Sequence, residues 1–299
     1  MDFNKYYEDR QKLVNTFLEK RLEKKGISRV DEAMAYSLLA GGKRIRPIIL
    51  MATADALGVS GYNFLPVACG LEMIHTYSLI HDDLPCMDDD EYRRGRLTNH
   101  KVFGEALALL AGDALLTLAF EVMLEQKNVP AEVLVETVRE VAMCAGNFGM
   151  VGGQVIDLDS EGRQISEEEL RKLHAGKTGA LFIAAVRSGA ASDELIALTK
   201  FADLLGLAFQ ITDDILDVEG DAAQMGKAAH SDEKKHKSTY VTLYTLEGAK
   251  ALAQKTVDEA LGCLEMFGEN AEALREITCA GVKAKLFVIE KKGGLLNAK

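Results

Sequence analysis

The sequence predicts an all-α protein, folded as one large helical bundle around a central cavity. Among its 299 residues only four prolines occur, and none follows Pro130. Long proline-free stretches that are rich in Ala, Leu, Glu and Lys favour helix. Nothing resembles a linker, a repeat or a low-complexity tract, so we expect residues 1–299 to form a single domain.

Two segments are predicted to be the central helices of the bundle. Residues 65–80 are apolar apart from Glu72, His75 and a few small polar groups, and residues 204–211 are apolar apart from Gln210. A helix that is apolar on nearly every side belongs inside a bundle, where other helices surround it.

Two further helices are predicted from local signals. Ser166 and Glu169 form a capping box, which predicts that a helix begins after Ser166. Val257, Leu261 and Leu264 recur at helical spacing with charged residues between them, which predicts an amphipathic outer helix.

An acidic cluster follows each of the two apolar segments. The clusters share a DD…D form and consist of Asp82, Asp83 and Asp88, and of Asp213, Asp214 and Asp217. Crowded carboxylates repel one another unless a cation holds them, and Mg²⁺ prefers such hard oxygen ligands. Solvated acidic helix ends are the alternative, but two clusters of the same form beside buried segments favour a metal–diphosphate site.

The spacing of the aspartates differs between the clusters. Asp213 and Asp217 lie about 40° apart on a helical wheel and share a face, whereas Asp82 and Asp88 lie about 240° apart. Pro85 interrupts the helix between the latter two, because proline lacks an N–H and disfavours helix at the preceding residue. We therefore expect residues 84–87 to bulge out and to return Asp88 to the side of Asp82.

Basic residues gather around both acidic clusters, as an anionic ligand requires. Arginine binds phosphate oxygens two at a time, and lysine adds a point charge. Each group alone is typical of a protein surface, but together they predict a diphosphate site. The groups are Lys43, Arg44 and Arg46 after a glycine pair, Arg93 and Arg94, Lys177 followed by Thr178, Lys227, and Lys237.

Composition excludes several classes of protein. The net charge of −11 argues against a nucleic-acid binder, which needs a basic face. Five cysteines without a CxxC pair read as reduced thiols, and the charged amino terminus has no signal-peptide apolar run. No 18-residue apolar run occurs, so we expect no membrane span and a soluble, cytoplasmic protein.

Ordered motifs along nearly the whole chain carry a family resemblance. They are GGKRIRP, LIHDDLPCMDDDEYRRGRLTNHKVFGE, LAGDALL, GGQVIDLD, HAGKTGALF, FQITDDILDVEGD and MGK…HKSTYV. The chain resembles trans-isoprenyl diphosphate synthases, and most closely the bacterial farnesyl diphosphate synthases (geranyltranstransferases). The resemblance implies an isoprenoid synthase fold and a homodimer.

The resemblance also implies roles for the motif residues. About three Mg²⁺ ions would be held by Asp82, Asp83 and Asp88 and by Asp213, Asp214 and Asp217. The allylic diphosphate would contact Arg93, Lys177, Thr178, Gln210, Lys227 and Lys237. Isopentenyl diphosphate would contact Gly42, Lys43, Arg46, His75 and Arg94 without metal, and the cavity would be lined by Gln154 and Asp157. The catalytic residues would be Lys177, Asp213, Asp82 and Arg93.

The implied reaction condenses isopentenyl diphosphate with dimethylallyl or geranyl diphosphate to give farnesyl diphosphate, with the departing diphosphate taking up the proton. The expected product has fifteen carbons, with Tyr77 and Ser78 setting the chain length. Three alternatives stay open: a geranylgeranyl diphosphate synthase, a terpene cyclase and an inactive regulatory subunit. A cyclase fits less well, because it needs aromatic faces for migrating cations and this chain has no tryptophan.

Overall fold

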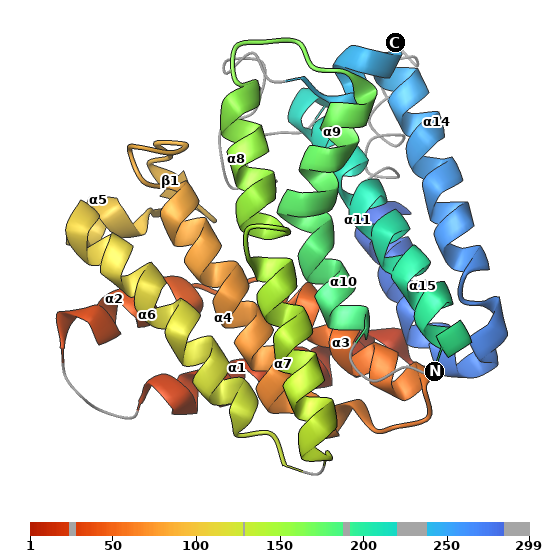
Figure 1. Cartoon of the computed structure of the whole chain (residues 1–299), viewed down its shortest axis with the longest axis horizontal. Helices are drawn as coiled ribbons and strands as arrows, with labels where there is room; N and C mark the ends of the chain where they lie inside the picture. Colours follow the sequence, from red (N-terminus) through yellow and green to blue (C-terminus); the bar gives the residue numbers. More distant parts are fainter. Residues whose placement is uncertain (24–27, 128, 188–191, 220–237, 284–299) are drawn as a thin grey trace, which may run out of the picture. The chain divides into compact units, whose positions relative to one another are not determined.

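The computed structural model describes residues 1–23, 28–127, 129–187, 192–219 and 238–283 (Figure 1). Within these residues the regular structure is helical apart from one short β-hairpin, so the predicted all-α fold class is confirmed. The chain separates into two compact units, Met1–Val141 and Ala142–Lys299. The single domain over residues 1–299 stays a prediction.

The first unit is a set of helices with one hairpin. Its elements are α1 (Phe3–Leu22), α2 (Arg29–Leu38), α3 (Ile45–Ala56), a 3₁₀ turn (Gly61–Phe64), α4 (Leu65–Asp82), β1 (Tyr92–Arg93), β2 (Arg96–Leu97), α5 (Asn99–Phe103), α6 (Glu105–Leu124) and most of α7 (Ala131–Ala145).

Helix α4 is the central helix of this unit, as its sequence predicts. It packs against α1, α2, α3 and α6, and Figure 1 shows it beside α6. Leu71, Met73 and Ile74 point in different directions around the helix, yet all three are fully buried. Pro66 lies in the first turn, where a backbone N–H has no partner within the helix to lose. The helix ends at Asp82.

The hairpin brings two consecutive arginines to a tight turn. Strands β1 and β2 are antiparallel, and Arg93 pairs with Arg96. The residues between them, Arg94 and Gly95, have φ values of 53° and 75°. Positive φ at both central positions is the signature of a type I′ turn, which matches the twist of a two-residue hairpin. Gly95 adopts this conformation without strain, whereas Arg94 does not.

The second unit is helical throughout its described residues. Its elements are α8 (Met150–Ser160), α9 (Glu167–His174), a π-helical turn (Ala175–Gly179), α10 (Ala180–Arg187), α11 (Ser192–Glu219), α14 (Tyr240–Gly262), a 3₁₀ segment (Glu265–Ala271), α15 (Glu272–Thr278) and a second π-helical turn (Cys279–Lys283).

Helix α11 is the central helix of this unit. None of residues 204–211 is exposed, as their apolar sequence predicts. Ile211 and Ile215 join Tyr240 and Ala249 of α14 in one buried cluster. Because the cluster directly adjoins Asp213 and Asp217 in sequence, it fixes the segment of α11 that carries the second acidic motif.

Of the two helices predicted from local signals, the structure confirms the start of one and shortens the other. Ser166 caps α9 as predicted: its N–H donates to Glu169 Oε2 at 3.0 Å, and the Glu169 N–H donates to Ser166 Oγ at 3.3 Å. Val257 and Leu261 lie on α14, but α14 ends at Gly262. The prediction that Leu264 continues the same helix is therefore wrong. Gly262 lacks a side chain to stabilise another helical turn.

Two described helices have the length and composition of a membrane span. They are Glu105–Leu124, with mean hydropathy 1.9, and Asp193–Glu219, with mean hydropathy 1.5. Core helices of soluble proteins pass the same test, and both helices pack against several neighbours within their own units. Neither of them is a clear membrane span.

Candidate active site

The first acidic motif lies at the end of α4, where the chain turns back on itself. Asp82 is the last helical residue, and the segment around Pro85 forms successive turns. The Asp88 N–H donates to the carbonyl oxygen of Asp82 at 2.8 Å. The bulge predicted from Pro85 is thus present, and it returns the backbone of Asp88 to Asp82.

Asp83 is bound to an arginine of the hairpin. Arg93 Nε donates to Asp83 Oδ1 at 2.8 Å, and Arg93 Nη2 donates to the same oxygen at 2.6 Å. Burial raises the pKa of Asp83, while the hydrogen bonds from Arg93 act in the opposite direction. Asp83, which is predicted to bind the metal, and Arg93, which is predicted to bind the allylic diphosphate, therefore form an ion pair with each other. This bidentate pair fixes the direction of Arg93.

The other hairpin arginine reaches the glycine pair of the GGKRIRP motif. Arg94 Nη1 donates to the carbonyl oxygen of Gly41. Gly42 has a φ of 133°, and a Cβ there would lie 2.7 Å from Arg94 Nη1. Only glycine leaves room for this approach, which brings Arg94 beside the loop that carries Lys43.

Arg44 does not belong to the ligand-binding cations. Its Nη1 lies 2.8 Å from Glu72 Oε1 of α4, and the two side chains are 1% and 3% exposed. Its Nη2 donates to the carbonyl oxygen of Leu38 at 2.8 Å. The charge of Arg44 is thus compensated inside the protein by Glu72. Lys43 and Arg46 remain as the candidate ligand-binding cations of this motif.

His75 lies on α4 among arginines. Burial lowers the pKa of His75 well below its ordinary value, and the charges of Arg46, Arg94 and Arg93 lower it further. The imidazole is therefore neutral at pH 7 and offers one N–H donor. A diphosphate at this position would favour the protonated form, because its charge offsets that of the arginines.

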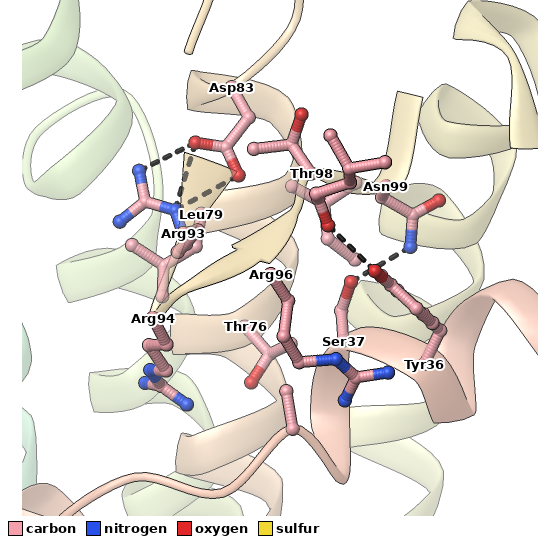
Figure 2. A pocket seen from close by; sticks show the side chains of 13 residues that line it. Tyr36, Ser37, Thr76, Leu79, Asp83, Arg93, Arg94, Arg96, Thr98 and Asn99 are labelled. Atoms are coloured by element: carbon pink, nitrogen blue, oxygen red, sulfur yellow. Dashed lines mark hydrogen bonds and ion pairs between the residues drawn. The ribbon is translucent and has the colours of Figure 1, made fainter. Parts of the chain in front are cut away.

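Several of these residues line one pocket of about 430 Å³, including space open to solvent. Figure 2 shows Arg93 directed at Asp83, while Arg96 extends toward Tyr36. The Arg96 guanidinium lies 4.3 Å from the centre of the Tyr36 ring. The lining residues are Tyr36, Ser37, Ala40, Thr76, Leu79, Ile80, Asp83, Arg93, Arg94, Arg96, Leu97, Thr98 and Asn99.

In the second unit, Lys177 is paired with Asp157. Lys177 lies in the π-helical turn, and its Nζ is 2.5 Å from Asp157 Oδ2 of α8. A Cβ on Gly153 would lie 2.1 Å from the backbone nitrogen of Lys177, so only glycine permits this contact between α8 and the turn. π-helical turns are frequent at functional sites.

Polar groups of α8, the turn and α11 continue this arrangement. Thr178 Oγ1 donates to Gln210 Oε1 at 2.7 Å. Both amide atoms of Gln154 are buried and lack a hydrogen-bond partner within the described residues. Leaving a buried amide unsatisfied is costly, so a ligand or an ordered water is expected to meet Gln154.

The three aspartates of the second motif have different surroundings. Asp213 is exposed, whereas Asp214 and Asp217 are 5% and 6% exposed. Asp214 Oδ2 accepts the backbone N–H of Tyr240 at 2.7 Å, so it helps to hold the first turn of α14. Asp213 is the one whose carboxylate is open to a ligand from solvent.

The donor set suits Mg²⁺. No three acidic, histidine or cysteine side chains of the described segments gather closely enough to hold an ion by themselves. Mg²⁺ usually takes one or two carboxylates and completes its shell with water and substrate phosphates. Single carboxylates such as Asp82, Asp88 and Asp213 therefore fit the ion together with a diphosphate. Lys227 and Lys237 lie outside the described residues.

The two predicted chain-length residues occupy different environments on α4. Tyr77 is 6% exposed, and its ring meets that of His81 edge-on at 5.6 Å. His81 in turn bonds the carbonyl oxygen of Leu109 on α6 at 2.9 Å. Ser78 is half-buried and donates to the carbonyl oxygen of His75 at 2.9 Å. Tyr77 is thus anchored through His81.

Sequence reasoning did not find the groups that hold these residues in place. Glu72 was noted only as a polar interruption of α4, yet it neutralises Arg44. The glycines of GGQ and AGKTG were not assigned a contact, yet Gly153 and Gly176 lie against each other. A signal was present in both cases: a single carboxylate in an apolar helix, and glycines inside helical sequence.

Comparison with known proteins shows which family the chain is similar to. Residues 27–277 match the polyprenyl synthetase family. The farnesyl diphosphate synthase of Geobacillus stearothermophilus is 46% identical over 84% of this chain and 87% of its own. The geranylgeranyl diphosphate synthase of Cyanophora paradoxa is 45% identical over 85% of this chain and 87% of its own. The crystal structure of an FPP/GFPP synthase from Zymomonas mobilis has a TM-score of 0.84 at 36% identity. The match covers 94% of this chain and 99% of that structure's chain.

The chain belongs to the polyprenyl synthetase family.

Proposed function

We propose that this protein condenses isopentenyl diphosphate with an allylic diphosphate, dimethylallyl or geranyl, and releases farnesyl diphosphate. Family membership makes it a prenyltransferase. The observation that carries the more specific proposal is the hairpin of the first unit. It joins Arg93, which is bound to the first acidic motif, to Arg94, which reaches the GGKRIRP loop.

The residues around Arg93 suit the allylic substrate. Cleavage of the allylic carbon–oxygen bond leaves negative charge on the departing diphosphate, and fixed cations lower the barrier by stabilising that charge. Arg93 is oriented by Asp83, and Lys177 is held by Asp157 with its side chain 25% exposed. In our proposal both cations meet diphosphate oxygens, with Thr178 and Gln210 beside Lys177.

Mg²⁺, about three ions, would supply further positive charge to the leaving group. We propose that Asp82, Asp88 and Asp213 bind it directly. Asp214 and Asp217 are buried and would support the backbone and the ligand from inside α11. Asp83 would act mainly by orienting Arg93, because its two oxygens already accept hydrogen bonds from that side chain.

Isopentenyl diphosphate keeps its diphosphate group during the reaction, so the residues that bind this group need not stabilise a leaving group. We assign isopentenyl diphosphate to Gly42, Lys43, Arg46, Arg94 and the neutral His75. Holding this substrate in place aligns its double bond with the allylic carbon, which raises the effective concentration of the two reactants. The new carbon–carbon bond forms, and the departing diphosphate takes the proton that the adduct loses.

Product length is the most specific part of the proposal. The farnesyl diphosphate synthases among the relatives and the buried ring of Tyr77, five residues before Asp82 on α4, support fifteen carbons. The second candidate is a twenty-carbon product. It is favoured by the 45% identity to a geranylgeranyl diphosphate synthase.

The test is direct. The purified protein is incubated with labelled isopentenyl diphosphate, geranyl diphosphate and Mg²⁺, and the dephosphorylated product is separated by chromatography. A linear fifteen-carbon alcohol is expected. A twenty-carbon alcohol would select the second candidate, a cyclic hydrocarbon would mean a terpene cyclase, and no product would mean an inactive subunit.

We further propose that the enzyme is a cytoplasmic homodimer. The cysteines within the described residues form no disulfide, which suits a reducing compartment. Leu109 and Leu110 on α6 are 46% and 55% exposed, which suits an apolar contact with a second copy. Light scattering of the purified protein would give twice the chain mass if this is correct, and the chain mass if it is not.

A further inference from the structure

A polar stripe runs along α1, the first helix of the chain. Tyr7, Gln11 and Asn15 recur every four residues, so they lie on one face of the helix. Arg10, Val14 and Leu18 form the neighbouring stripe, which is buried. The buried stripe packs α1 against its unit. This packing fixes the position of α1 along and around its own axis, and so fixes the position of the polar stripe.

All three polar residues contact the loop that carries the GGKRIRP motif. The Tyr7 hydroxyl donates to the carbonyl oxygen of Lys43. Gln11 Nε2 donates to the carbonyl oxygen of Gly42 at 2.9 Å, and Asn15 Oδ1 accepts a hydrogen bond from Arg44 Nε at 2.9 Å. Three consecutive loop residues are therefore each held by one residue of α1.

The loop needs such support because its backbone is not in a common conformation. Gly41, Gly42 and Arg44 have φ values of 84°, 133° and 52°. A non-glycine residue with positive φ costs on the order of 1 kcal/mol and persists only where its surroundings hold it. Arg44 is held by Asn15 on one side and by Glu72 on the other.

These contacts also decide what the loop presents to an anion. A carbonyl oxygen repels a diphosphate, and those of Gly42 and Lys43 are bound to α1 instead. In a trans peptide the following N–H points the opposite way, and no described peptide bond is cis. The N–H groups of Lys43 and Arg44 therefore point away from α1.

We propose that Tyr7, Gln11 and Asn15 are positioning residues for the isopentenyl diphosphate pocket, acting through the backbone of Gly42, Lys43 and Arg44. The inference rests on the function proposed above, which assigns that pocket to Lys43 and Arg46. Helix α1 lies outside residues 27–277, the part of the chain that matches the family, so membership does not supply this role.

Adjacent tyrosines provide a matched test. Tyr7→Phe removes the hydroxyl that bonds the loop, whereas Tyr6→Phe removes a hydroxyl that bonds Asp55 Oδ2 at 2.6 Å. We expect Tyr7→Phe and Gln11→Leu each to raise the KM for isopentenyl diphosphate about threefold to tenfold, the value of one hydrogen bond. The KM for geranyl diphosphate and kcat should stay within about twofold.

Tyr6→Phe is expected to lower the melting temperature at least as much as Tyr7→Phe, yet to leave both KM values unchanged. The inference is overturned if Tyr7→Phe and Gln11→Leu leave the KM for isopentenyl diphosphate unchanged, or if Tyr6→Phe raises it equally. Lys43→Ala separates the two proposals. If it too leaves that KM unchanged, the pocket assignment fails and the inference fails with it.

Gln11→Glu adds a second readout. It keeps the size of the side chain, but it replaces the amide donor with a carboxylate beside the carbonyl oxygen of Gly42. We expect a larger increase in KM for isopentenyl diphosphate than in Gln11→Leu, and a weaker affinity in calorimetric titration of isopentenyl diphosphate alone. An affinity equal to that of the wild type would overturn the role of Gln11.

Discussion

Cations of the candidate site differ in how firmly their protein partners hold them. The Arg44–Glu72 pair is almost fully buried, with side chains 1% and 3% exposed, so separating it would leave an uncompensated charge inside the protein. Lys177 is 25% exposed and Asp157 11% exposed. Water and ligand oxygens reach Lys177 more easily, so we expect Lys177, and not Arg44, to leave its carboxylate for an anionic ligand.

Loss of a metal-binding carboxylate should abolish turnover without unfolding the protein. We expect Asp82→Ala and Asp213→Ala each to lower kcat/KM by about 10² or more, because each removes a proposed ligand of the ion that would neutralise the leaving group. Steady-state kinetics measure the loss, and circular dichroism checks the fold. Asp258→Ala, at an exposed position of α14, is the control and should behave as wild type. Full activity in excess chelator would contradict this assignment.

The half-buried imidazole of His75, among the charges of Arg46, Arg94 and Arg93, should make stability depend on pH. Its pKa in the folded protein is lowered, so the unfolded chain binds more protons near pH 6. Stability from this source is complete above the unfolded pKa of about 6.5 and decreases as the pH falls below it, by up to about 1.4 kcal/mol per pH unit. Urea unfolding at pH 7 and pH 5 should show a smaller decrease for His75→Gln than for wild type. Equal decreases would show that His75 is not responsible.

At the scale of single elements, the sequence predicted the backbone features that depend on local signals. The apolar segments before Asp82 and Asp213 lie within α4 and α11, Pro85 turns the chain after Asp82, and Ser166 caps α9. Each of these features depends on residues within a few positions of one another, so the sequence pattern contains the information.

Features that depend on distant partners could not be predicted in the same way. The bond of Arg93 to Asp83, the burial of Arg44 against Glu72 and the contact of Gly153 with the π-helical turn all require knowledge of which segments pack together. The hairpin carries only a weak local signal: Gly95 suits a two-residue turn, but Arg94 stands where Asn, Asp or Gly is usual.

The two basic elements should separate in kinetics. We expect Lys43→Ala and Arg46→Ala mainly to raise the KM for isopentenyl diphosphate, since we propose that the loop after Gly42 binds this substrate, which does not ionise. Lys177→Ala should also lower kcat, because in our proposal Lys177 stabilises charge that develops during bond cleavage. Initial rates with each substrate varied in turn measure both constants. The same pattern in all three variants would mean that there are not two pockets.

Product length should depend on one turn of α4. Tyr77→Ala is expected to lengthen the product toward twenty carbons, because removing a buried ring deepens the cavity by up to one helical turn, about 5.4 Å. Ser78→Phe should shorten it toward ten carbons by filling space nearer Asp82. Chromatography of the products distinguishes these outcomes. Tyr62→Ala, at a residue 48% exposed outside α4, serves as the control. Unchanged products in both α4 variants would mean that Tyr77 only packs between helices.

At the scale of the whole molecule, ligands should stabilise the chain only in combination. Mg²⁺ completes its coordination shell with phosphate oxygens, so we expect Mg²⁺ and diphosphate together to bind the folded protein more tightly than either does alone. At a ligand concentration of 100 Kd the gain is about 2.7 kcal/mol, which raises Tm by several degrees. Differential scanning fluorimetry with Mg²⁺, diphosphate or both measures this, and chelator should reverse it. An equal rise with diphosphate alone would argue against metal binding.

The type I′ turn places two arginines side by side that we assign to different substrates. Arg93, bound to Asp83, and Arg94, bound to Gly41, are consecutive residues of one hairpin. A ligand that draws Arg93 from Asp83 therefore also changes the free energy of placing Arg94. Such coupling is reciprocal: whatever factor one diphosphate applies to the affinity for the other, the second applies to the first. We expect the two substrates to bind cooperatively, through two consecutive residues.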